Sequence, residues 1–460
     1  MYAQRREEQP HTRGAEQSVC ERGVGHFHYY VSSPMSPTSA QLAKPSRARY
    51  WVVVFSVTLA ILSYIDRVSI SQAAKRIQGD LKLNDQEIGA IFGAFGLAYA
   101  LFEIPGGWLG DWLGAKKVLI RIVLCWSVFT AATGAAFSYL SLWIVRFLFG
   151  AGEAGCFPNI TKALSVWMPV DERVRGQAVV WAFARWGGAF TPPLVVLAFQ
   201  YMSWRTAFVM FGFLGALWCI AFAMWFKDDP REHPSVNAGE RALLAGVAEQ
   251  AGSHGDVPWG KLVGSRSVWL LWVQYFCMSF PWYFYITFLP KYLIENRHLT
   301  EAQASNYAIL PLLFGGFGSI FAGFLARRIN NMMGSVTAGR RLLSIGGFIS
   351  AGLFLIMVTR LQDTLWAMIA MGMASFCNDL IMPGALGTCM EIGKKYECSV
   401  SCSMNMMGNL AGFAAPMVGG YILQHYNKDY HLFIYVMAGM YVIGALVWPF
   451  IDPETPLEQD

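Results

Sequence analysis

The segment 51–73, WVVVFSVTLAILSYIDRVSISQA, places Asp66 and Arg67 side by side in a mainly apolar run that is long enough to cross a membrane. A transmembrane helix needs about 20 mainly apolar residues. Each full charge inside such a helix costs roughly 2.5–3.5 kcal/mol on membrane-insertion scales. A simple membrane anchor has no use for these charges, so we interpret the pair as part of a functional site that moves an ion or a proton.

The composition of the whole chain is typical of a membrane protein. Of its 460 residues, 55% are hydrophobic and only 14% are charged, whereas about a quarter of the residues in a soluble protein are charged. The modest net charge of +5 favours membrane topology over nucleic-acid binding. The nine cysteines form no CxxC pair and no His-paired spacing. We therefore expect buried hydrophobic thiols, with no metal site and no cofactor.

Twelve apolar windows recur along the sequence and predict twelve transmembrane helices. A polar stretch separates the first six windows from the last six, which is the layout of two parallel repeats. The sequence thus predicts an all-α membrane protein made of two six-helix halves. The windows are 50–73, 88–109, 118–137, 140–165, 176–200, 204–226, 267–292, 304–326, 341–359, 364–388, 399–423 and 431–451. The expected domains are a disordered segment 1–48, bundles 49–226 and 267–451, a central loop 227–266 and a tail 452–460.

Basic residues indicate how the spans are oriented. They gather in loops on one side of the membrane, and positively charged loops stay in the cytoplasm. We therefore expect an inner-membrane, multi-pass protein whose termini and central loop are cytoplasmic. The basic residues of these loops, apart from the central one, are Lys44, Arg47, Arg49, Lys116, Lys117, Lys162, Arg173, Arg175, Arg327, Arg328, Arg340, Arg341, Lys394 and Lys395.

The loop between the second and third spans carries a glycine-rich motif, GWLGDWLGAKK at 107–117. Glycines allow two helix ends to approach closely, and Asp111 can meet a helix N-terminus or a nearby arginine in one conformation. The motif resembles the signature loop of the major facilitator superfamily, which implies the major facilitator fold. Its gating residues would be Gly107, Asp111, Gly114, Lys116 and Lys117.

The fourth span contains two charged residues, Arg146 and Glu153. Seven residues make almost two helical turns, so both side chains project from one face about 10 Å apart along the axis. Each therefore needs a partner from another helix or from a ligand. A carboxyl group in a cavity of low polarity binds a proton more readily than one in water. The alternative is a structural ion pair with another helix.

Several motifs together resemble the anion:cation symporter family of the superfamily. This family includes bacterial carriers of hexuronate, galactonate and glucarate, and animal sialin and vesicular glutamate transporters are relatives. The resemblance covers about residues 50 to 450. The residues that carry it are Tyr64-Ile-Asp66-Arg67, Tyr99, Glu103-Ile-Pro-Gly-Gly-Trp108, Arg146 to Glu153, Phe157-Pro-Asn159, Trp167-Met-Pro169, Asp171-Glu-Arg173, Asn405-Met-Met-Gly-Asn409 and Pro416.

The resemblance implies roles for individual residues. The sugar-acid carriers of the family are proton symporters, so Asp66 and Glu153 would carry protons and Arg67 would hold the substrate carboxylate, which a guanidinium binds bidentately. For the tyrosines the alternative is helix packing, and for the two asparagines it is hydrogen bonding between helices. The expected substrate-binding residues are Tyr64, Arg67, Tyr99, Arg146, Arg185, Tyr283, Asn405 and Asn409.

Arg185 departs from the family pattern, because galactonate-type relatives have a neutral amide there. If Arg185 faces the cavity, it adds a second fixed positive charge, which a second negative group on the substrate would explain. The alternative is that Arg185 pairs with Glu153 or Asp66. Asp379 is a further acid in the tenth span, and the sequence does not indicate its partner.

These features predict a transporter and not an enzyme, since the chain has no Walker loop, nucleophile elbow or metal cluster. We expect proton-coupled symport of an organic anion, such as hexuronate, galactonate or glucarate, into the cell by alternating access. The expected partners are that anion, protons and the lipid bilayer, without nucleic acid, and we expect a monomer. The alternatives are an inorganic-anion carrier for phosphate or nitrate and an anion exchanger, which would need neither Glu153 nor the Tyr and Asn residues.

Overall fold

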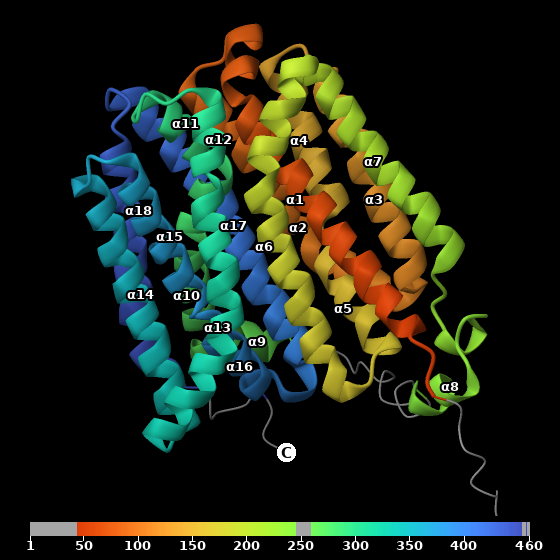
Figure 1. Cartoon of the computed structure of the whole chain (residues 1–460). Coiled ribbons are helices and arrows are strands. Elements are labelled where there is room, and N and C mark those ends of the chain that lie inside the picture. The colour runs from red at the N-terminus through yellow and green to blue at the C-terminus, as the bar shows by residue number, and fades with distance from the viewer. Residues whose placement is uncertain (1–43, 245–258, 453–456, 458–460) are drawn as a thin grey trace, which may run out of the picture. The chain divides into compact units, whose positions relative to one another are not determined.

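The computed structural model describes residues 44–244, 259–452 and 457, and its regular elements are helices. The predicted segments 1–48 and 452–460 lie largely outside these residues. The helices, coloured along the chain in Figure 1, are α1 (Ala48–Leu81), α2 (Asp85–Leu113), α3 (Ala115–Gly134), α4 (Tyr139–Glu153), α5 (Cys156–Trp167), α6 (Val170–Tyr201), α7 (Trp204–Trp225), η1 (Pro230–Glu232), α8 (Ala238–Leu244), α9 (Trp259–Gly264), α10 (Arg266–Thr287), α11 (Leu289–Glu295), α12 (Glu301–Tyr307), α13 (Ile309–Met333), α14 (Val336–Arg360), α15 (Thr364–Asp379), α16 (Met382–Gly393), η3 (Lys394–Tyr396), α17 (Glu397–His425), α18 (Tyr430–Val447) and η4 (Trp448–Phe450).

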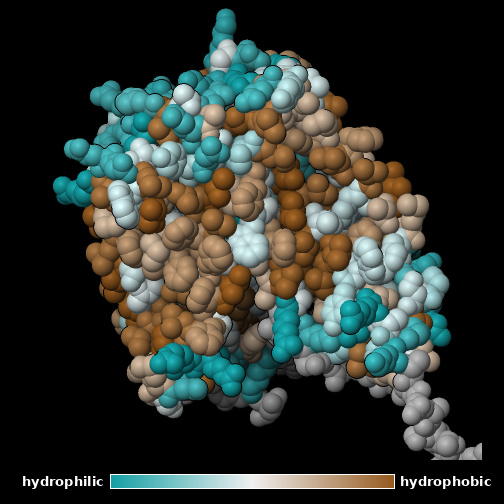
Figure 2. Space-filling model, in the orientation of Figure 1, coloured by the Kyte–Doolittle hydropathy of each residue, from teal (hydrophilic) through white to brown (hydrophobic). Residues whose placement is uncertain are grey.

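These helices make twelve membrane spans in two six-helix halves, as the sequence predicts. Among the described residues, ten helical stretches are long and apolar enough to cross a membrane by themselves. The two remaining spans are α6, with 32 residues, and α10, with 22 residues. Apolar side chains form a band between two hydrophilic ends on the face shown in Figure 2. That band is the surface expected to contact lipid.

Four spans that the sequence predicts as continuous helices are divided in the described structure, and in two of them, the fourth and the tenth, the division follows an acid. In the fourth span α4 ends at Glu153, and Gly155 adopts a φ of 83°, a left-handed conformation that glycine takes without steric cost. In the tenth span α15 ends at Asp379, and Pro383 stands in the first turn of α16. Proline suits this position because it lacks the N–H that a helix start leaves unpaired. Each of these two breaks therefore follows an acid directly, in the fourth span of its half.

The two halves pack tightly on the face where α1 ends and α2 begins, which we call the opposite face. There α2 and α17 lie side by side (Figure 1). A Cβ atom added at Gly96 would lie 2.6 Å from the backbone nitrogen of Phe413, and one added at Gly89 would lie 3.0 Å from the Cα of Gly420. Only glycine fits such approaches between backbones.

Ion pairs reinforce this contact between the halves. Lys291 of α11 pairs with Asp85 of α2, and its Nζ donates to Oε1 of Gln78 at 3.0 Å. Arg76 of α1 donates to Glu301 of α12 at 2.7 Å. The structure therefore has its two halves joined on the opposite face, away from the terminal face where α1 begins and α18 ends.

Gly96→Ala should weaken this closure, because the added methyl group meets backbone that cannot move aside. Overpacking of this kind costs about 1–3 kcal/mol, so the melting temperature in detergent should fall. The control is Gly346→Ala in α14, where an added Cβ meets nothing within 4 Å. Equal melting temperatures for the two variants would show that the α2–α17 contact is not tight.

Candidate functional site

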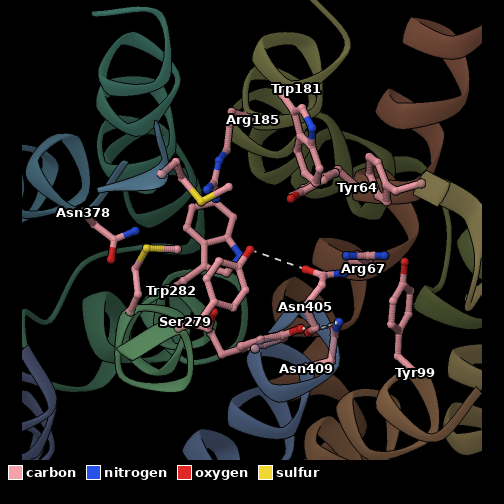
Figure 3. Close-up of a pocket in the computed structure, with 16 residues that line it drawn as sticks. Tyr64, Arg67, Tyr99, Trp181, Arg185, Ser279, Trp282, Asn378, Asn405 and Asn409 are labelled. Atoms are coloured by element: carbon pink, nitrogen blue, oxygen red, sulfur yellow. Dashed lines mark hydrogen bonds between the residues drawn. The ribbon is translucent and has the colours of Figure 1, made fainter. Parts of the chain in front are cut away.

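A cavity lies between the two halves and takes side chains from both. Figure 3 shows rings, amides and two guanidinium groups turned toward it. The first half contributes Tyr64, Arg67, Tyr99, Phe157, Trp181 and Arg185. The second half contributes Tyr275, Met278, Ser279, Trp282, Tyr283, Asn378, Met382, Asn405, Gly408 and Asn409.

Seven of the eight side chains that the sequence nominates for substrate binding line this cavity. The eighth, Arg146, does not, and instead lines a smaller neighbouring cavity together with Arg67 and Tyr283. Neither nominated proton carrier lines the main cavity. The structure thus brings the nominated residues together, while their roles stay predictions. The seven are Tyr64, Arg67, Tyr99, Arg185, Tyr283, Asn405 and Asn409.

Arg67 is neutralised by Glu153, which lies behind it and is fully buried. The Nε of Arg67 donates to Oε1 of Glu153 at 2.9 Å, and the Ser63 hydroxyl donates to the same oxygen. The guanidinium also lies over the ring of Tyr99, 4.9 Å from its centre, a favourable cation–π arrangement. Among the described residues Nη2 of Arg67 has no hydrogen-bond partner. The guanidinium therefore has hydrogen-bonding capacity that Glu153 does not use, and the Arg67 side chain lines the cavity.

Asp66 projects away from the main cavity and is buried. Within the described part of the chain its Oδ1 has no hydrogen-bond partner. It interacts electrostatically with Arg146 and Glu153. Arg146 itself lies over the ring of Phe149 at 4.2 Å, and its Nε and Nη1 lack partners among the same residues. The adjacent residues thus lie in two different environments: Arg67 lines the cavity, whereas Asp66 is buried behind the helix.

Glu103 belongs to the site although sequence reasoning did not nominate it. Its buried carboxylate on α2 accepts hydrogen bonds from the amides of Asn405 and Asn409 on α17, the second at 3.0 Å. The hydroxyl of Tyr283 donates to Oδ1 of Asn409 at 2.7 Å. In this conformation the two amides therefore link the halves, as the alternative interpretation expected. The sequence does contain an indication of this role, because Glu103 is an acid inside an apolar window and such acids mark functional sites.

Arg185 lines the cavity and pairs with Asp379, so the alternative of a pairing with Glu153 or Asp66 is wrong. Nη2 of Arg185 on α6 donates to Oδ1 of Asp379 on α15 at 2.6 Å. The guanidinium also stacks on Trp282, 3.5 Å from the ring centre. Asp379 is fully buried. The partner of this acid thus comes from the other half of the protein, which a single sequence does not reveal.

The glycine-rich motif packs against the second half of the fourth span. Gly114 separates α2 from α3 with a φ of 84°, and the backbone N–H of Lys116 donates to Asp228 at 2.8 Å. The carbonyl of Gly110 accepts from Nζ of Lys162 at 2.7 Å. The side chain of Asp111 lies outside the described residues, so its expected contact stays a prediction. The motif therefore connects the loop to the helix that follows the break at Gly155.

Glu103→Gln should loosen the two halves. A glutamine offers one acceptor oxygen and turns an NH₂ group toward two amide donors, and an unsatisfied buried polar group costs about 1–3 kcal/mol. Spin labels at the exposed positions Trp112 and Met390, in a background without the native cysteines, should report longer and broader distances. Glu232→Gln, at an exposed site on η1, is the control. Identical distance distributions in both variants would rule out this link.

Comparison with known proteins agrees with the fold. Residues 57–416 match the model of the Major Facilitator Superfamily. A probable sulfoacetate transporter of Cupriavidus necator is 34% identical, over 88% of this chain and 94% of the relative. A probable galactarate/D-glucarate transporter of Escherichia coli is 29% identical, over 90% of this chain and 95% of the relative. The inward-facing, occupied crystal structure of a bacterial homolog of the human lysosomal transporter Spinster superposes with a TM-score of 0.64, at 18% identity over 88% of this chain and 96% of that one. The chain is therefore an anion transporter of the major facilitator superfamily.

Proposed function

We propose that the protein is a proton-coupled symporter that carries a small organic anion, of the sugar-acid type or a related short acid, into the cell. The observation that carries the proposal is the pairing of Arg67 with Glu153. Arg67 lines the cavity, and the buried acid behind it neutralises its charge. A cation with an internal counter-ion can exchange that counter-ion for a substrate carboxylate when the acid takes up a proton.

Charge conservation explains why the proton and the anion travel together. In a cavity of low polarity an unpaired charge is costly, and removing one member of a buried ion pair costs about 3–5 kcal/mol. When Glu153 is protonated, Arg67 is left without its partner, and an incoming carboxylate restores neutrality. Deprotonation of Glu153 on the cytoplasmic side reverses the exchange and releases the anion. Binding of either species is therefore weak without the other.

Asp66 is the second proton carrier in this proposal. It is buried and acts on Arg146 and Glu153 electrostatically, without lining the main cavity. Protonation of Asp66 changes the charge behind Arg67 and so influences the same exchange. This role is indirect, whereas Glu153 bonds directly to the substrate-binding arginine.

The lining of the cavity favours an organic anion. Tyrosine hydroxyls, amides and aromatic rings surround the arginines, and such groups suit a ligand with hydroxyls and a carbon skeleton. The names of the relatives refer to sulfoacetate, galactarate and D-glucarate, hexuronate and L-galactonate. Phosphate is the substrate in the name of a plant relative, and nitrate was the other inorganic candidate. A carrier of inorganic anions would not need the tyrosines.

The orientation that follows from the basic loops puts the terminal face in the cytoplasm of an inner-membrane protein. The opposite face, where Lys291 pairs with Asp85, then faces outward. The conformation is accordingly one in which the outer side is closed, and alternating access proceeds by rocking of the two halves. The protein works as a monomer, because one chain supplies both halves of the cavity.

Arg67→Ala should abolish substrate binding, because the guanidinium that lines the cavity is the cation proposed to hold the carboxylate. A thermal-shift screen of the purified protein against sugar acids, sulfoacetate and dicarboxylates first identifies the ligand, since binding to the folded state raises the melting temperature. The variant should then show no shift with that ligand. An unchanged affinity would exclude Arg67 from the binding site.

Glu153→Gln should keep substrate binding but lose uphill accumulation, because the amide resembles the protonated acid and cannot release a proton. Uptake and counterflow are measured in proteoliposomes with and without a pH gradient. Asp66→Asn is tested in the same way for the second carrier, and Glu232→Gln serves as the surface control. Gradient-driven accumulation by the Glu153→Gln variant would exclude Glu153 as a coupling residue. Wild-type exchange without any response to the gradient would favour the anion-exchanger alternative.

A further inference from the structure

The structure contains a second ion pair that repeats the arrangement of the first. Glu153 is the last residue of α4 and Asp379 is the last residue of α15, each directly before the break in the fourth span of its half. Both acids are fully buried, and each bonds to an arginine that lines the same cavity. The cavity therefore holds two arginines, each with its own buried carboxylate.

The second pair differs from the first in one respect. Arg67 and Glu153 belong to the same half, whereas Arg185 lies on α6 of the first half and Asp379 on α15 of the second. Nη1 of Arg185 and Oδ2 of Asp379 have no hydrogen-bond partner among the described residues. Gly315 of α13 leaves the room that Oδ2 occupies, since an added Cβ would lie 2.7 Å from that oxygen. The pair is thus held by a single hydrogen bond, Arg185 has hydrogen-bonding capacity that Asp379 does not use, and its side chain lines the cavity.

We propose that Arg185 and Asp379 form a second anion-and-proton site, so that the transported anion carries two negatively charged groups. Asp379 takes up a proton when the second group binds Arg185. The charges balance at each stage: the resting pair is neutral, and the protonated acid with an arginine–anion pair is neutral as well. Leaving the arginine without a counter-ion is the costly alternative. This inference rests on the proposed proton-coupled transport and adds the substrate class and one further proton.

The surroundings of Asp379 support its role as a proton acceptor coupled to Arg185. Arg185 is the cation that faces the carboxyl group of Asp379. Its guanidinium also stacks on Trp282, and this contact can hold the guanidinium at the cavity wall when the ion pair with Asp379 is broken. The other described groups near the carboxyl are neutral: an amide, hydroxyls and a thiol. They are Asn378, Cys377 and Ser375 on its own helix, Tyr275 and Tyr285 on α10, and Tyr441 on α18. Protonation of Asp379 therefore depends chiefly on whether Arg185 has another anion.

The test compares matched ligands and variants in proteoliposomes. The dianionic probes are D-glucarate and sulfoacetate, and the monoanionic probe is D-gluconate, which lacks one carboxylate of glucarate. Wild-type protein should move one more proton per dianion than per monoanion. Asp379→Asn should lower the proton-to-dianion ratio by one while retaining dianion binding. Arg185→Gln should weaken the dianions roughly 10- to 100-fold, the range for one charged hydrogen bond, and leave D-gluconate almost unchanged.

The control for a purely structural role is Asp85→Asn. It also removes the acid of an ion pair between the halves, with Lys291, but Asp85 does not line the cavity. Its proton-to-dianion ratio should equal that of the wild type. An Asp379→Asn ratio equal to wild type, equal losses for both ligand classes in Arg185→Gln, or a wild-type protein that binds only monoanions would each overturn the inference. A wild-type protein without any proton coupling would instead overturn the proposed function.

Discussion

A charge at the depth of the bilayer has to be neutralised where it lies, and the contact between Arg67 and Glu153 does this for the cavity. Arginine does not lose its proton in proteins, so an arginine facing the cavity requires an anion at all times. Glu153 supplies that anion from a position with no exposure. The wall of the cavity can then consist of rings, hydroxyls and amides, because the acids stay behind it. The same requirement accounts for Asp379 behind Arg185.

The broken helices give these acids their positions. Glu153 and Asp379 end their helices, where the backbone carbonyls point outward and carry partial negative charge. The next helix begins three residues after each acid, at Cys156 and Met382, and its N-terminus carries the opposite partial charge. The arginine is the full positive charge that faces each carboxylate at the break. Each acid is thus sensitive to whatever else neutralises its arginine.

The sequence predicts the fold well, because its hydropathy indicates twelve spans and the polar stretch between the sixth and seventh windows indicates two halves. It also predicts seven cavity residues, since their motifs resemble a family whose architecture they share. It does not predict the partner of Arg185, because Asp379 lies 194 positions further along the chain. Glu103 was missed for a related reason, since its amide partners are 302 and 306 positions away. The break after Glu153 depends on one left-handed glycine, which resembles any other glycine in a transmembrane sequence.

The packing of α6 and α10 has a consequence for how the protein is made. These two helices supply much of the cavity, including Arg185, Tyr275 and Tyr283. In the folded protein α6 packs against α1 and α13, and α10 against α17 and α18. The partners α13, α17 and α18 are synthesised later, and so is Asp379 of α15, the acid that pairs with Arg185. During translation the charge of Arg185 therefore has to wait for its counter-ion until the second half of the protein has been made.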